Sequence, residues 1–158
     1  MVETIDELSR LAKELNQQSD NLNALIMTLN KKLAALNFGV EVWHAEPIEA
    51  GDFREGYDDE ERLIEKYRGV VVLGYSKVQD TWQLAVREEM WRTDLASVGE
   101  REFTVNPDPP SPLLKAPRET RIKALRLVPK LLDDLRDEAK ALLNSIGQGK
   151  KLAAKLGS

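Results

Sequence analysis

His44 is the only histidine of the chain and therefore the only imidazole that could act as a general base. A Ser–His–acid triad would need it in that role, but no nucleophile motif lies near it. The sequence has no cysteine, which excludes a thiolate nucleophile, a thiolate zinc site and a disulfide. We therefore expect His44 to be structural or merely exposed. Scattered carboxylates are the only other candidates for acid–base chemistry, so we nominate no catalytic residue and do not expect an enzyme.

An acid-rich segment follows this histidine. Residues 46–61 include eight acids and a single base, Arg54. Carboxylate oxygens are ligands that hard cations prefer, but the Asp-x-Asp-x-Asp-Gly spacing of a calcium loop is missing, as is any glycine-rich phosphate loop. We expect an exposed loop over 46–61, with weak contact to a cation or a basic partner as the alternative. No metal and no other cofactor is predicted.

Two arginines, Arg118 and Arg121, fall in the first turn of a predicted helix, where the helix dipole disfavours positive charge. The helical phase also points them along the apolar side, where guanidinium groups need carboxylate or phosphate oxygens as partners. In one interpretation they bind a small anionic ligand or phosphate at the helix N-terminus, together with Lys115. In the other they form salt bridges with acids of the strands, namely Glu88, Glu89, Glu100 or Glu102.

A basic stripe continues along the same helix. Lys123, Arg126 and Lys130 share one face, because successive residues of a helix are rotated by about 100°. Such a stripe could contact a phosphate backbone, but the net charge of the chain is −4 and no helix-turn-helix pattern is present. We expect a solvated face and do not expect nucleic-acid binding.

The N-terminal region predicts a helix over residues 4–37. Apolar residues recur at alternating steps of three and four from Ile5 onward, and only Ser19 interrupts them. Thr4 is in position to cap the helix, and Asn37 is typical of a helix end. The helix would be about 50 Å long at 1.5 Å per residue.

A helix of that length is hard to cover within one small chain, so we expect part of its apolar stripe to be an interface. Association of two copies into a four-helix arrangement would bury it, with a protein partner as the alternative. Ser19, flanked by the polar Asn16 and Asn23, could fix the register. The residues predicted for this interface are Leu8, Leu15, Leu22, Ile26, Leu29, Leu132, Leu135 and Leu142.

A second helix is predicted over residues 117–146, after a proline-rich linker at 107–116. Its apolar residues repeat without a break, but Pro129 lies inside and cannot donate a backbone hydrogen bond. We expect either a kink there or two helices that meet at Pro129. Glycines at the end predict that residues 147–158 form a basic tail beyond the helix.

Between the helices the pattern alternates with a period of two, which predicts a β-meander over residues 39–106. A tight turn at 78–81 would join two of its strands as a hairpin. Residues 63–67 are ambiguous between a short helix and the start of a strand, and Gly74 indicates a bulge or a close packing contact with a helix. The predicted strands lie at residues 40–45, 70–75, 82–87 and 101–105.

These elements predict an α+β fold with a three- or four-stranded antiparallel sheet between two long helices. The two helices enter and leave the same sheet, so we expect them to run antiparallel, either across one sheet face or as a projecting stalk. This order of elements resembles that of prefoldin subunits, whose terminal helices form a coiled coil around a β core. The resemblance lies in the element order alone.

The sequence therefore predicts one domain, residues 1–158, without catalytic function. We expect a protein-interaction domain that self-associates as a dimer through its amphipathic helices, with anionic-ligand binding at Arg118 and Arg121 as the alternative. No apolar run reaches the roughly 20 residues that a membrane span needs. The N-terminus is acidic rather than signal-like, so we expect a cytoplasmic protein.

Overall fold

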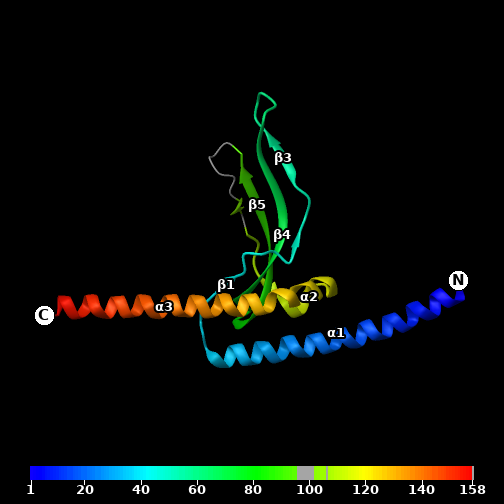
Figure 1. Cartoon of the computed structure of the whole chain (residues 1–158), viewed down its shortest axis with the longest axis horizontal. Helices are drawn as coiled ribbons and strands as arrows, with labels where there is room; N and C mark the ends of the chain where they lie inside the picture. The colour runs from blue at the N-terminus through cyan, green and yellow to red at the C-terminus, as the bar shows by residue number, and fades with distance from the viewer. Residues whose placement is uncertain (96–101, 106, 158) are drawn as a thin grey trace.

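The computed structural model describes residues 1–95, 102–105 and 107–157 of the chain. A long helix forms near each end, and an antiparallel sheet lies between them, as the sequence predicts. In Figure 1 a long twisted hairpin stands upright, and the two helices lie across its lower end. The fold is α+β, with the helices gathered at the base of a projecting sheet.

Helix α1 extends from Val2 to Leu36, close to the predicted range. Asn37 ends it in the left-handed region, with φ of 53°, a conformation that asparagine tolerates better than most residues. At the other end Met1 precedes the helix and no side chain caps it, so the capping predicted for Thr4 is not observed.

The sheet is built on one long hairpin. Strand β4 (Leu63–Val78) pairs with β5 (Thr81–Asp94) along nearly its whole length. The turn between them is tight because Gln79 and Asp80 both have positive φ, at 52° and 64°, which is the geometry of a type I′ turn. The ambiguous residues 63–67 are the first part of β4.

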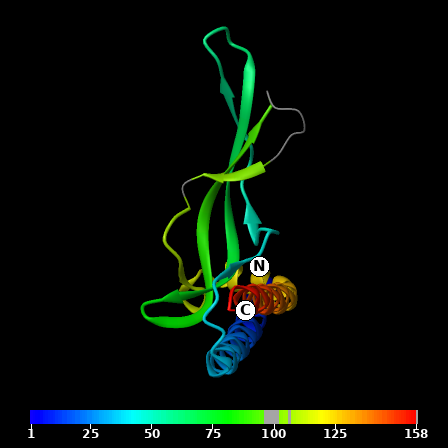
Figure 2. The ribbon, with the colours of Figure 1, turned by 90° about the vertical axis from the view of Figure 1, so that its left-hand side faces the viewer.

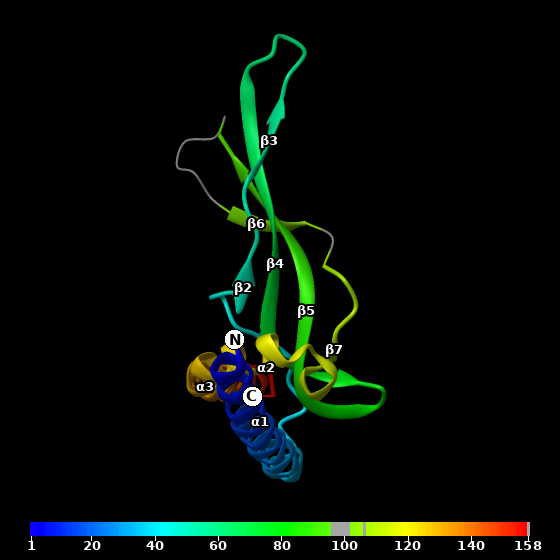
Figure 3. The same ribbon diagram turned by 90° about the vertical axis from the view of Figure 1, so that its right-hand side faces the viewer.

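Short strands line both edges of this hairpin, so the sheet is four strands wide in the order β1-β4-β5-β6 (Figure 3). Two of the short strands lie inside residues 46–61, which is therefore not a plain loop. The strands along β4 are β1 (Val42–Trp43), β2 (Glu49–Ala50) and β3 (Arg54–Tyr57), and those along β5 are β6 (Glu102–Val105) and β7 (Ser111–Pro112).

The C-terminal region is a series of helical segments rather than one kinked helix. Pro129 lies in the first turn of the last segment, where its missing N–H leaves no hydrogen bond unmade. The expectation of two helices meeting at Pro129 is therefore the one that holds. The segments are η1 (Leu113–Lys115), α2 (Arg118–Ala124), η2 (Leu125–Leu127) and α3 (Val128–Leu156).

Helix α3 continues past Gly147 and Gly149 to Leu156, so the expected helix end at residue 146 and the basic tail at 147–158 are wrong. Each glycine costs a helix only about 1 kcal/mol relative to alanine. Lysines in the last two turns offset part of that cost, because positive charge is favourable at the negative end of the helix dipole.

Helices α1 and α3 run in the same direction, not antiparallel as expected (Figure 1). Arg118 contacts Asn16 and Arg121 contacts Asn23, so residue numbers rise together along α2 and α1. The reason lies in the linker, which descends along β5 and delivers the chain to the middle of α1. The helices consequently form neither a stalk nor a hairpin, and the prefoldin-like arrangement is not adopted.

The hydrophobic core lies where the helices cross the lower half of the hairpin (Figure 2). Tyr75, buried here with a raised pKa because burial disfavours its phenolate, stacks on Trp82 with ring centroids 5.6 Å apart. The buried residues of the core are Leu22, Ile26, Leu33, Ile48, Leu73, Tyr75, Leu84, Val86, Leu113, Ala116, Ala124, Leu127, Val128, Leu131 and Leu135.

Candidate interaction surface

The two predicted site arginines dock α2 onto α1. Arg118 donates from Nη2 to Oδ1 of Asn16 at 2.8 Å, and Arg121 donates from Nη1 to Oδ1 of Asn23 at 2.6 Å. Both partners are neutral amides rather than the carboxylates or phosphates that we expected. The pair therefore has an evident structural role in fixing where α2 lies along α1.

These contacts belong to a ladder of asparagines that the sequence reasoning did not identify. Asn16, Asn23 and Asn30 are spaced by seven residues, so they form one line along α1. Asn30 accepts a hydrogen bond from the backbone N–H of Leu84 in β5 at 2.9 Å. The seven-residue spacing beside an apolar stripe was the available signal, and it marks the side of α1 that meets the rest of the chain.

Two of the acids that we considered as salt-bridge partners bind other arginines. Glu89 pairs with Arg87 at 2.9 Å, and Glu102 pairs with Arg68 at 2.9 Å. Glu100 lies outside the described residues. Lys115 lines a cavity of about 350 Å³ whose wall includes neither Arg118 nor Arg121. Anion binding by this group stays a prediction.

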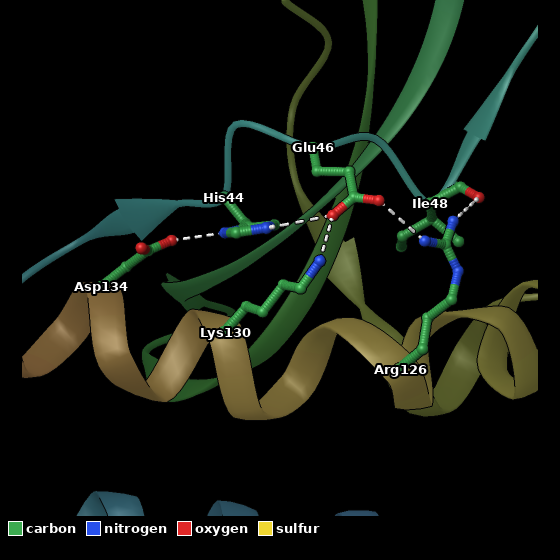
Figure 4. Close-up of polar contacts among 6 residues, drawn as sticks. All are labelled: His44, Glu46, Ile48, Arg126, Lys130 and Asp134. Carbon is green, nitrogen blue, oxygen red and sulfur yellow. Dashed lines mark hydrogen bonds and ion pairs between the residues drawn. The ribbon is translucent and has the colours of Figure 1, made fainter.

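The basic stripe on α2 and α3 is neutralised by the acid-rich segment of the same chain (Figure 4). Glu46 accepts hydrogen bonds from Lys130 at 2.7 Å and from Arg126 at 2.9 Å. Lys123 lies 3.6 Å from Glu49. The stripe is therefore a set of ion pairs that hold residues 46–49 against the helices, which is an unfavourable starting point for a phosphate backbone.

His44 belongs to the same set of contacts, which hold residues 44–49 against the helices and are here named the brace. Its Nδ1 lies 2.5 Å from Oδ2 of Asp134 on α3, and the ring is mostly buried (Figure 4). The imidazole thus links β1 to α3. The sequence left open whether His44 is structural or merely exposed, and the buried ring corresponds to the first of these. Within the described residues, no group of three or more histidine, aspartate or glutamate side chains is arranged to hold a metal ion.

The ion pairs of the brace should make the thermal stability of the chain depend on pH in the acid range. Lys130 and then Arg126 hold the pKa of Glu46 below its usual value of 4.5 by hydrogen bonding to the carboxylate. A pKa lowered by folding adds stability above the unfolded-state value and loses it as the pH falls through the folded-state value. We expect Glu46→Gln to lower the Tm near neutral pH, with a difference from the unmodified chain that fades below pH 4.5.

Thermal melts across that pH range, with Glu138→Gln on the exposed side of α3 as the control, measure this effect. A Tm difference for Glu46→Gln that is the same at neutral and acid pH would show that the charge of Glu46 contributes nothing.

The first half of α1 projects beyond the rest of the chain. All side chains of residues 2–18, here named the N-terminal arm, are exposed, whereas Ser19 is the first buried residue of the helix. The arm continues the apolar stripe that enters the core further along α1. Its large exposed apolar side chains are Val2, Ile5, Leu8, Leu11 and Leu15.

The last turns of α3 project in the opposite direction (Figure 1). Residues 136–156, here named the C-terminal arm, follow the last buried residue, Leu135. They also continue a stripe that begins in the core. The large apolar side chains exposed on this arm are Leu142, Leu143, Ile146, Leu152 and Leu156.

The structure thus divides the predicted interface in two. Leu22, Ile26 and Leu135 are buried in the chain's own core, and Leu29 and Leu132 pack against it, so these five are already covered. The remaining three lie on the arms and are widely exposed: Leu8 at 59%, Leu15 at 45% and Leu142 at 41%.

The fold and surface define an α+β protein with two amphipathic helical arms. Comparison of the chain with protein-family models, with curated proteins and with solved structures found no match. Among the described residues, no helix combines the length and the apolar character that crossing a bilayer requires.

Proposed function

We propose that this chain is a non-catalytic interaction domain that self-associates through the apolar stripes of its two arms. The proposal is supported by one observation above all: the stripes that enter the core on α1 and α3 continue, exposed, for several turns beyond it. A stripe confined to intrachain packing would end where the core ends.

The physical driving force is burial of large apolar side chains. Leu8, Leu15 and Leu142 are each only about half exposed, so complete burial would contribute roughly half of the about 1.5–3 kcal/mol that a fully exposed leucine gains. Most helical stability in proteins comes from packing of an amphipathic face, so packing against a partner would also stabilise both arms. Opposite each stripe the arms carry charged side chains, such as Arg10 and Lys140, as expected for helices with one covered face.

The test is the mass of the protein in solution. We expect the unmodified chain to show about twice the mass of one chain by light scattering after size exclusion at micromolar concentration. Leu8→Glu and Leu142→Glu should each shift it to the mass of one chain, because a carboxylate would lie inside the apolar contact. Neither side chain contributes to the core, so both variants should remain folded, which circular dichroism of the whole chain checks.

Arg10→Glu is the matched control. It introduces the same side chain on the same arm, two residues from Leu8 but on the charged face, and should leave the mass unchanged. An unmodified chain that is a strict monomer at micromolar concentration would exclude self-association.

A further inference from the structure

The directions of the arms restrict how two copies can cover each other. Helices α1 and α3 run the same way, and the N-terminal arm and the C-terminal arm leave the base at opposite ends (Figure 1). A two-fold rotation perpendicular to the helices reverses both directions. It therefore brings the N-terminal arm of one copy to the same side as the C-terminal arm of the other, in antiparallel orientation.

The lengths of the arms match this arrangement. At 1.5 Å per residue, residues 2–18 span about 25 Å and residues 136–156 span about 31 Å. One symmetric contact made twice would cover both arms. A pairing of α3 with α3 of the second copy would cover only the C-terminal arms and leave Ile5 and Leu8 exposed to water.

The stripes also fit each other in size. If Val2 is placed opposite Leu156, the apolar positions of the two arms fall into register layer by layer. In three of the four inner layers a large side chain faces alanine or glycine, which lets helices pack closely. The facing pairs are Ile5 with Ala153, Leu8 with Gly149, Ala12 with Ile146, and Leu15 with Leu142.

Gly149 supports this register because the chain's own packing does not explain it. Among the described residues, a Cβ atom at Gly149 would meet nothing within 4 Å. A glycine in the interior of a helix costs about 1 kcal/mol relative to alanine. Close approach of Leu8 from a second copy would use the space that the missing side chain leaves.

Charge determines the direction of the pairing. The start of the N-terminal arm carries three acidic side chains and no basic one over residues 2–9: Glu3, Asp6 and Glu7. The C-terminal arm ends with three lysines and no acid over residues 148–157: Lys150, Lys151 and Lys155. Antiparallel packing places these two ends side by side, where they attract, whereas parallel packing separates them.

We infer that a second copy of this chain docks by reciprocal exchange of arms, the N-terminal arm of each copy packing antiparallel on the C-terminal arm of the other. This inference rests on the proposed self-association and adds to it the identity, direction and register of the paired segments.

Disulfide trapping tests the inference cleanly because the chain has no cysteine of its own. Ile5→Cys and Ala153→Cys are made as separate proteins, one of them carrying an affinity tag, and are refolded together before mild oxidation. We expect a covalent dimer that contains one chain of each kind. Either variant alone should give none, since the two-fold axis holds identical positions far apart.

A mixture of Ile5→Cys with Ala139→Cys is the control for parallel packing. In the antiparallel register these positions are about 21 Å apart, given 1.5 Å of rise per residue, so no bridge should form. A bridge in this control would overturn the inferred direction. So would a dimer in which Leu142→Cys bridges to itself, because that identifies pairing of α3 with α3.

Light scattering and disulfide trapping together distinguish a failure of self-association from a failure of arm exchange. A dimer by light scattering without a bridge between Ile5→Cys and Ala153→Cys would refute the arm exchange and leave self-association standing. A monomer by light scattering would refute both.

Discussion

Leu131→Ala is expected to lower the free energy of unfolding by about 2–5 kcal/mol. Leu131 has 0% of its surface exposed and lies in the first turns of α3, where that helix crosses the base of the sheet. It belongs to the same buried cluster as Leu84 of β5 and Ile26 of α1. Truncation would leave a cavity where the three layers meet, and a close-packed interior collapses only partly around such a cavity.

Urea unfolding of both proteins at one fixed concentration measures this loss, because the stability of a self-associating chain depends on concentration. Leu25→Ala is the control: it removes the same atoms from α1 at a position 47% exposed, and should cost no more than about 1 kcal/mol. Equal losses for the two variants would mean that α3 does not dock where the structure places it.

Periodicity predicted the elements of this fold well because the pattern of each element is local. The steps of three and four located α1 within two residues of its start. The apolar run at 70–75 and the alternating residues at 82–87 both fall inside the hairpin strands, which extend well beyond them. Asn37 ends α1 as expected. The end of α3 was predicted wrongly because Gly147 and Gly149 were given more weight than they have: in an exposed helix two glycines are a modest cost.

The direction of the helices could not be predicted from local patterns. It depends on where the linker at 107–116 delivers the chain, and that path is set by β7, a two-residue strand on β5. Two-residue strands leave no periodic signal in a sequence. The long-range pairs between Glu46 and the basic stripe had a visible basis in composition, but only the fold shows that the acid-rich and base-rich segments face each other.

For the candidate surface, the sequence predicted one interface stripe along both helices, and part of that stripe is buried within the chain itself. Leu22, Ile26 and Leu135 follow the same pattern as Leu8 and Leu142. Nothing in that pattern distinguishes the residues buried in the core from those exposed on the arms. The polar neighbours of the stripe carried the missing information. Asn16, Asn23 and Asn30 receive hydrogen bonds from the same chain, so the docked part of α1 begins near Asn16 and the free part lies before it.

Gly74→Ala is expected to destabilise the sheet by about 1–3 kcal/mol through overpacking. Gly74 pairs with Trp43 across β4 and β1, and a Cβ atom there would overlap Cε3 of the indole. This is the close packing contact that Gly74 indicated, made by a neighbouring strand rather than a helix. Trp43 cannot move away freely, because Arg87 lies 4.1 Å from its ring centroid and its Nε1 donates to Glu41.

A double-mutant cycle separates this clash from a general effect of alanine in the strand. In a Trp43→Ala background the indole is gone, so Gly74→Ala should cost less than it does in the unmodified chain, because the clash is absent and alanine suits a strand better than glycine. Equal costs in the two backgrounds, within about 0.5 kcal/mol, would show that the indole does not lie on Gly74. The position of β1, and with it the brace from His44 to Asp134, would then be wrong, since Trp43 and His44 are neighbours in the chain.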